Sequence, residues 1–117
     1  MTKIAVMSCK KIHDVSCIAC AKCHKAMQVG NGEYARYDDV ELVAMTDCGD
    51  CPGVLVPKLK LLMEITRNLG REIEVLYLGT CMKLAMETAA CPIDYDLIKP
   101  ILESQFGIEV VLGTHTY

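Results

Sequence analysis

The 117-residue chain has no tryptophan and a single phenylalanine, so aromatic rings can contribute little to its core. Apolar residues nevertheless make up 52% of the sequence, which argues against disorder and predicts a core of Leu, Ile, Val, Met and Ala. No apolar run approaches the ~20 residues that a membrane-spanning helix needs. The net charge of −3 is spread over interspersed acids and bases, so neither a nucleic-acid surface nor a membrane partner is expected. We expect one domain over residues 1–117.

Signals for secretion and for nucleotide binding are also missing. The stretch Met1–Met7 is too short for a signal peptide, and Lys10 and Lys11 follow it closely. We therefore expect a cytoplasmic protein. Neither G-x-G-x-x-G nor G-x-x-x-x-G-K-S/T occurs, so the sequence predicts no phosphate-binding loop of these kinds.

Cysteine, in contrast, is abundant, with 8 residues in the chain. In a reducing cytosol thiols are kept from forming stable disulfides, so a cysteine-rich chain favours metal or redox chemistry. Individual cysteines can still be buried core residues, because a thiol behaves as a small apolar group.

Four short runs rich in Val, Ile or Leu are typical of parallel strands covered on both faces. They are Ile4–Met7, Val40–Met45, Ile73–Leu78 and Ile108–Leu112. Helical spacing and terminating glycines predict helices between them at Ile18–Gln28, Val54–Leu69 and Tyr95–Gln105, with a short helical turn at Lys83–Thr88. Right-handed crossovers then predict a small α/β fold: a doubly wound parallel sheet of about four strands in the flavodoxin-like order 2-1-3-4, with helices on both faces.

Two local features refine this prediction. Asp94 is the expected N-cap of the last helix, and Pro100 within it predicts a kink or a late start. The stretch Ile73–Cys81, which ends in Leu-Gly-Thr-Cys, resembles Ile108–His115, which ends in Leu-Gly-Thr-His. The third and fourth predicted strands therefore end in similar sequences.

Each predicted strand is followed by a thiol or an imidazole. Cys9 follows the first strand, Cys48 and Cys51 the second, Cys81 the third and His115 the fourth. Ligands of open α/β sheets bind at the carboxyl ends of the strands. Neighbouring strands lie only ~4.8 Å apart, so these loops can converge on one small site.

Cys17, Cys20 and Cys23 form a C-x2-C-x2-C run, which is the core of the bacterial ferredoxin motif. On a straight helix the three sulfurs would spread over about 120°, so we expect the start of this segment to be irregular. The fourth cysteine of the ferredoxin motif would fall at Met27, so another segment must supply the fourth ligand. The candidates for this ligand are Cys9, Cys81 and Cys91.

Cys48 and Cys51 flank a strand-to-helix turn, where a helix N-terminus stabilises thiolates. This C-x-x-C suits metal ligation, a thioredoxin-type dithiol or a structural role. Asp47 and Asp50 beside it are expected to cap the following helix or to hydrogen-bond the site, and capping is preferred. His115 is a candidate ligand or proton carrier, while solvated roles are preferred for His13 and His24.

The combination and order of these motifs resemble the CGGC-domain family of small metal-binding proteins. The relevant stretches are Cys9–Ile12, Cys17–Cys23, Cys48–Gly53, Leu78–Cys81, Cys91-Pro92 and Gly113–His115. One departure is plain, because Asp50 replaces the second glycine of the naming motif. The resemblance implies metal binding through cysteines and histidine, and it implies no particular reaction.

The leading hypothesis is an iron–sulfur protein with a four-iron, four-sulfur cluster, acting in electron transfer, redox sensing or cluster handling. Zinc is the first alternative, because sets of four thiolates, or of three thiolates and an imidazole, suit tetrahedral zinc. A thiol–disulfide oxidoreductase using Cys48 and Cys51 is the second. A redox partner protein and a homo-oligomer are both compatible with these residues. The predicted metal ligands are drawn from Cys9, Cys17, Cys20, Cys23, Cys48, Cys51, Cys81, Cys91 and His115.

Overall fold

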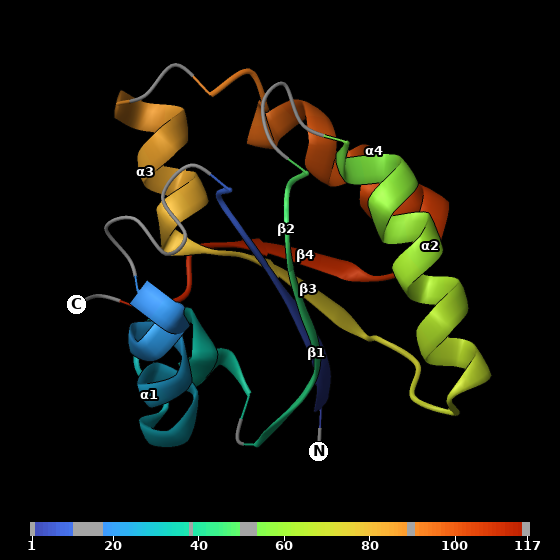
Figure 1. The fold of residues 1–117 in the computed structure, drawn as a ribbon, viewed down its shortest axis with the longest axis horizontal. Helices are drawn as coiled ribbons and strands as arrows, with labels where there is room; N and C mark the ends of the chain where they lie inside the picture. The colour runs from blue at the N-terminus through green and yellow to red at the C-terminus, as the bar shows by residue number, and fades with distance from the viewer. Residues whose placement is uncertain (1, 11–17, 38, 50–53, 89–90, 116–117) are drawn as a thin grey trace.

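The computed structural model is an α/β fold built on a four-stranded parallel sheet (Figure 1). It describes residues 2–10, 18–37, 39–49, 54–88 and 91–115. The strands are β1 (Thr2–Ser8), β2 (Val40–Asp47), β3 (Val75–Leu78) and β4 (Glu109–Leu112). The α-helices are α1 (Ala21–Val29), α2 (Leu55–Asn68), α3 (Thr80–Thr88) and α4 (Tyr95–Phe106), and the short 3-10 helices are η1 (Ile18–Cys20) and η2 (Gly32–Arg36).

The strand order is β2-β1-β3-β4 with every pair parallel, which confirms the predicted order 2-1-3-4. The register aligns the carboxyl ends of the strands. Ser8 lies opposite Asp47, and Leu78 lies opposite both Met7 and Leu112. The residues that follow the four strands therefore start from one edge of the sheet.

Helices cover both faces of the sheet, as predicted, because successive side chains of a strand point to opposite faces. On one face, Ile4 and Val6 of β1 pack in a core with Ala26 of α1 and Tyr34 of η2. On the other, Ala5 and Met7 pack in a larger core that α2, α3 and α4 supply with Leu59, Met82 and Leu102. Figure 1 shows α1 on the side of the sheet away from α2 and α4.

The edge strand β2 differs from the prediction of burial on both faces. Every residue of β2 is half-buried, whereas all four residues of β3 are buried. The difference follows from strand order, since β2 has a neighbouring strand on one side and β3 has one on each side. Apolar composition alone predicts the strand and does not reveal its place at the edge.

Two helices differ in detail from the prediction. The short turn expected at Lys83–Thr88 is the end of the longer helix α3, so Cys81 lies in a first helical turn. Helix α4 begins at Tyr95, where the carboxylate of Asp94 accepts the Asp96 N–H at 3.0 Å. The expected N-cap is thus confirmed. Of the kink or late start expected from Pro100, the late start is wrong, since Pro100 lies within the helix.

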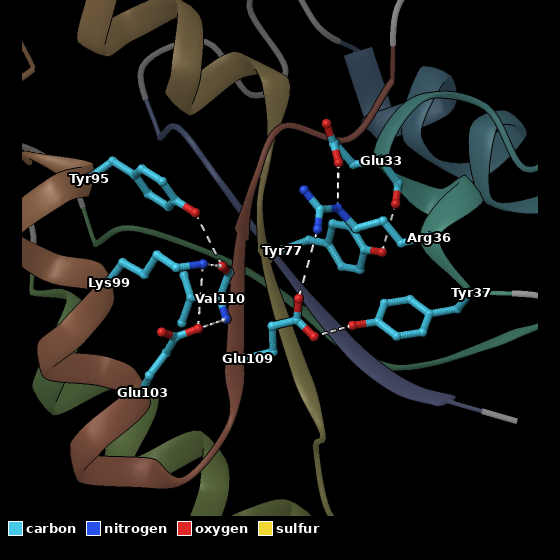
Figure 2. A network of polar contacts seen from close by, with 9 residues as sticks. All are labelled: Glu33, Arg36, Tyr37, Tyr77, Tyr95, Lys99, Glu103, Glu109 and Val110. Carbon is cyan, nitrogen blue, oxygen red and sulfur yellow. Dashed lines mark hydrogen bonds and ion pairs between the residues drawn. The ribbon is translucent and has the colours of Figure 1, made fainter.

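Side chains of α4 close the outer edge of β4, as Figure 2 shows. The carbonyl oxygen of Val110 accepts from Tyr95 Oη at 3.2 Å and from Lys99 Nζ at 2.7 Å. The Val110 N–H donates to Glu103 Oε2 at 3.1 Å. These bonds occupy backbone groups of Val110 that an added strand would otherwise use.

None of the helices in the described ranges combines the length and the apolar character that crossing a bilayer requires.

Candidate functional site

The carboxyl ends of the four strands lie side by side. Backbone hydrogen bonds also join the residues that follow three of these strands to the ends of the neighbouring strands. Three bonds do so: Cys48 N–H to Ser8 O at 3.0 Å, Gly79 N–H to Met7 O at 2.8 Å and Gly113 N–H to Leu78 O at 2.7 Å. We use the term carboxyl edge for the residues that follow the four strands. These include Cys9, Cys48, Cys81 and His115. The predicted delivery of one thiol or imidazole past each strand end is thus present in the structure.

Cys9 and Cys81 meet at the carboxyl edge. The backbone N–H of Cys9 donates to the Sγ atom of Cys81 at 3.1 Å. Gly79 leaves room for this sulfur, because a Cβ atom there would lie 3.2 Å from Cys81 Sγ and 3.3 Å from the Met7 carbonyl oxygen. Backbone N–H bonds to sulfur favour the thiolate form and tune metal sites. Cys81 therefore lies in a position that suits a thiolate ligand.

Cys48 is buried at the end of β2, with 4% of its surface exposed. It belongs to the same apolar core as Cys9, and Cys81 and Cys91 pack against that core. The Cys48 carbonyl oxygen accepts the Val54 N–H at 2.9 Å, which ties the strand end to the start of α2. Its motif partner Cys51 lies outside the described residues.

Asp47 does not cap α2, so that preferred role was wrong. The N-cap position of α2 is Val54, which makes no side-chain capping bond. The Asp47 carboxylate instead accepts from the Gly49 N–H at 2.8 Å and from Lys58 Nζ at 2.6 Å. The bond from Lys58 is the main cause that lowers the pKa of Asp47, and the Gly49 N–H and the charge of Lys10 add to it. Asp47 therefore fixes the turn before the second cysteine motif. Asp50 lies outside the described residues.

The C-x2-C-x2-C segment begins irregularly, as its spacing predicted. Ala19 and Cys20 both have φ values of 55°, which is the left-handed region that residues other than glycine rarely occupy. Such strained conformations concentrate at ligand sites and switch regions. Cys20 and Cys23 are buried, with 8% and 6% of their surfaces exposed. Cys17 lies outside the described residues.

A pair of threonines joins this segment to the carboxyl edge. Thr114 Oγ1 lies 3.2 Å from the Cys23 Sγ atom. Thr114 Oγ1 also accepts the Thr80 N–H at 3.2 Å, and Thr80 Oγ1 accepts the Thr114 N–H at 2.9 Å. The Thr80 hydroxyl donates to the His115 carbonyl oxygen at 2.9 Å. The repeated Gly-Thr sequence after β3 and β4 was visible in the sequence, and its role is this reciprocal link between the two strand ends.

Replacing Thr114 by valine should test this link. Valine keeps the shape of the fully buried side chain and removes the oxygen that accepts the Thr80 N–H. Leaving this partly buried N–H without its acceptor costs about 1 kcal/mol or more, so we expect the free energy of unfolding to fall by that amount. Urea denaturation measures the change. Thr114→Ser, which keeps the oxygen, is the matched control, and equal losses in both variants would contradict a role for the hydroxyl.

Tyr34 adds a buried hydroxyl that no motif or spacing in the sequence indicated. Its side chain lies beside Cys23 and Thr114, and 1% of its surface is exposed. Burial is the largest cause that raises the pKa of Tyr34 above its usual value, and the neighbouring Cys23 raises it further. The hydroxyl is therefore protonated at neutral pH.

His115 is half-buried at the end of the described chain. Burial lowers the pKa of His115, and the charge of Lys22 lowers it further. The imidazole is therefore neutral at pH 7, which is the form that binds metals. A cleft of about 110 Å³ reaches His115, and its walls include Thr80, Lys83 and Thr114.

The remaining predicted residues are placed as follows. Cys91 is half-buried after α3, and its N–H donates to the Ala85 carbonyl oxygen at 3.2 Å. His24 is exposed on α1, and His13 lies outside the described residues. Among the residues that the structure describes, no three Cys, His, Asp or Glu side chains lie close enough together to hold a metal ion. The ligand set therefore stays a prediction.

Comparison with known proteins adds the family. The sequence model of the CGGC domain matches residues 3–115. A relative from Methanocaldococcus jannaschii, "Uncharacterized protein MJ0582", is 38% identical over 119 residues, which cover 97% of this chain and 87% of the relative. No solved structure matches the chain. The family match and the cysteine content together indicate a metal-binding protein. The match spans both cysteine motifs and all four strand ends, so this chain belongs to the CGGC-domain family.

Proposed function

We propose that the chain is an iron–sulfur protein that carries a four-iron, four-sulfur cluster at the carboxyl edge of the sheet. Its role would be electron transfer, redox sensing or cluster handling in the cytoplasm, with a redox partner protein to exchange electrons. The observation that carries the proposal is the contact of Cys9 with Cys81 at this edge, together with the link from Cys23 to the same edge through Thr114.

The donor set fits an iron–sulfur cluster in its chemistry. Thiolates are the ligands that such clusters take, and the sulfur of Cys81 already accepts a backbone N–H. Cys9, Cys20, Cys23 and Cys48 are buried, so the site can exclude water. A bound cluster would supply one-electron chemistry, and the protein would tune it through N–H bonds to sulfur and through burial.

The described thiols do not complete a ligand set by themselves. The proposal therefore requires Cys17 or Cys51, from the segments outside the described residues, to join the described cysteines. Both belong to the spaced motifs whose other members, Cys20, Cys23 and Cys48, are buried.

A zinc site is the second candidate, and the state of His115 favours it. Zinc takes imidazole together with thiolates, and burial lowers the pKa of His115, which favours its neutral, metal-binding form. A dithiol oxidoreductase is the third candidate. The burial of Cys48 weighs against it, because the attacking thiol of such an enzyme must be reached by its substrate.

Metal analysis of protein purified without oxygen decides between these functions. The proposal predicts iron and acid-labile sulfide in equal amounts, approaching about four of each per chain. Zinc without iron or sulfide would overturn it in favour of the zinc site. No metal of either kind would also overturn it, and Cys48→Ser would then test the dithiol, since this variant should abolish thiol–disulfide exchange.

A further inference from the structure

The hydroxyl of Tyr34 is buried beside the polar groups of Cys23 and Thr114. Tyr34 is 1% exposed, and its hydroxyl lies within reach of these two groups without meeting either in ideal hydrogen-bond geometry. Its ring packs against that of Tyr77, with 4.9 Å between the centroids. A buried O–H that lacks a strong acceptor destabilises the fold, so phenylalanine would suit the packing alone. The hydroxyl therefore needs a reason beyond packing.

The neighbours of this hydroxyl are the Cys23 thiol and the Thr114 hydroxyl, and Thr114 Oγ1 is 3.2 Å from Cys23 Sγ. A thiol is a weak acceptor, whereas a thiolate is a strong one. Tyr34 is thus placed beside a group that accepts strongly only after it loses its proton.

The hydrogen bonds of Thr80 and Thr114 show which hydroxyl proton is available to Cys23. The Thr80 hydroxyl proton goes to the His115 carbonyl oxygen, and Thr80 Oγ1 accepts the Thr114 N–H. Thr114 Oγ1 accepts the Thr80 N–H. Each hydroxyl has one proton, so that of Thr114 can turn to Cys23 when the sulfur carries no proton of its own. Two O–H donors then face one sulfur.

We propose that Tyr34 is a positioning residue for Cys23, and that its hydroxyl, with that of Thr114, donates to the Cys23 sulfur in the thiolate or metal-bound state. This inference rests on the proposed function, because it takes Cys23 as a ligand. It adds a residue outside the cysteine motifs that stabilises the ligand in its binding form and sets the electron density on its sulfur.

The first test uses metal-free protein and the variant Tyr34→Phe. The rate at which iodoacetamide alkylates Cys23 at pH 8 is measured by peptide mass mapping, which resolves Cys23 from the other thiols. Loss of a donor lowers the fraction of Cys23 that is present as thiolate. The remaining thiolate is more nucleophilic, which offsets only part of this loss, so we expect alkylation to slow by roughly threefold. A purely structural role predicts the opposite, because looser packing would expose Cys23 and speed its alkylation.

Tyr77→Phe is the matched control. Tyr77 is equally buried and lies in the same core, but its hydroxyl donates to the Glu33 carbonyl oxygen at 2.9 Å. Its loss should not slow the alkylation of Cys23. If Tyr34→Phe fails to fold, 3-fluorotyrosine at position 34 replaces it as the test, since its more acidic hydroxyl is a stronger donor and should speed alkylation in a folded protein.

The second test uses the iron-loaded protein. Removing an O–H donor from a ligand sulfur destabilises the reduced cluster, so Tyr34→Phe should shift the midpoint potential to more negative values and Tyr77→Phe should leave it unchanged. If Cys23 of Tyr34→Phe is alkylated at least as fast as in the parent and the midpoint potential is unchanged, the role proposed for Tyr34 is wrong. The proposed iron–sulfur function would not be affected by this result. Parent protein without iron would overturn the proposed function, while the alkylation rates would still decide whether Tyr34 donates to Cys23.

Discussion

Gly32→Ala should lower the free energy of unfolding by about 3 kcal/mol or more, which is a large part of the stability of a small domain. Gly32 has a φ of +60°, and a Cβ atom there would lie 2.3 Å from the Thr114 carbonyl oxygen. That oxygen accepts the Glu33 N–H at 2.9 Å. Alanine would therefore add a steric clash with backbone to the cost of about 1–2 kcal/mol for a left-handed side chain.

The measurement is urea denaturation, with Gly30→Ala as the matched control. Gly30 has a similar φ of +69°, but a Cβ atom there meets nothing within 4 Å. Its alanine variant should lose only the conformational cost. The difference between the two variants isolates the contact of η2 with the Thr114 segment. Equal losses would show that this contact is not tight.

Cys81→Ser should reduce the iron and sulfide content of protein purified without oxygen by roughly tenfold or more, because the cluster would lose a ligand at the carboxyl edge. The fold should survive the change. Serine has nearly the same shape, and its oxygen can accept the Cys9 N–H that Cys81 Sγ now accepts. The loss would thus report on ligation and not on folding.

The control for Cys81→Ser is the unfolding of the metal-free variant and the metal-free parent. Their free energies should agree within about 1 kcal/mol, the typical net value of one hydrogen bond. Iron and sulfide at the level of the parent in a folded Cys81→Ser protein would remove Cys81 from the ligand set.

The fold was predictable because apolar runs and chain handedness together leave few arrangements of the sheet. The run Ile4–Met7 lies within β1, the run Ile73–Leu78 contains β3, and both strands are central. The run that became β2 is similarly rich in apolar residues but lies at the edge and is only half-buried. Burial of a strand depends on its neighbours, and composition does not encode them.

The irregular start of the C-x2-C-x2-C segment was predictable from helix geometry. Three sulfurs at that spacing do not share one side of a straight helix, and the chain indeed takes left-handed conformations at Ala19 and Cys20. The role of Asp47 was not predictable in the same way. The Asp47 carboxylate could have capped α2 or paired with a nearby cation. In the structure it accepts a hydrogen bond from Lys58, in the first turn of α2, instead of capping the helix.

The polar surroundings of Cys23 escaped prediction because they join distant parts of the chain. Cys23 and Thr114 are 91 residues apart, and no periodic pattern links positions at such a separation. Tyr34 likewise meets Cys23 only through the packing of η2 against α1 and the sheet. The repeated Gly-Thr pair was the one sequence feature that indicated these contacts. Its role becomes clear only from the pairing of β3 with β4, which places the two Gly-Thr segments side by side.

Anomalous X-ray scattering at the iron edge, from crystals grown without oxygen, would locate a cluster in the fold. We expect a strong iron peak at the carboxyl edge, bordered by Cys81 and by the C-x2-C-x2-C segment, with the Cys9 N–H directed at a ligand sulfur. An iron peak elsewhere in the molecule, or no iron peak in crystals of protein that binds only zinc, would contradict this expectation.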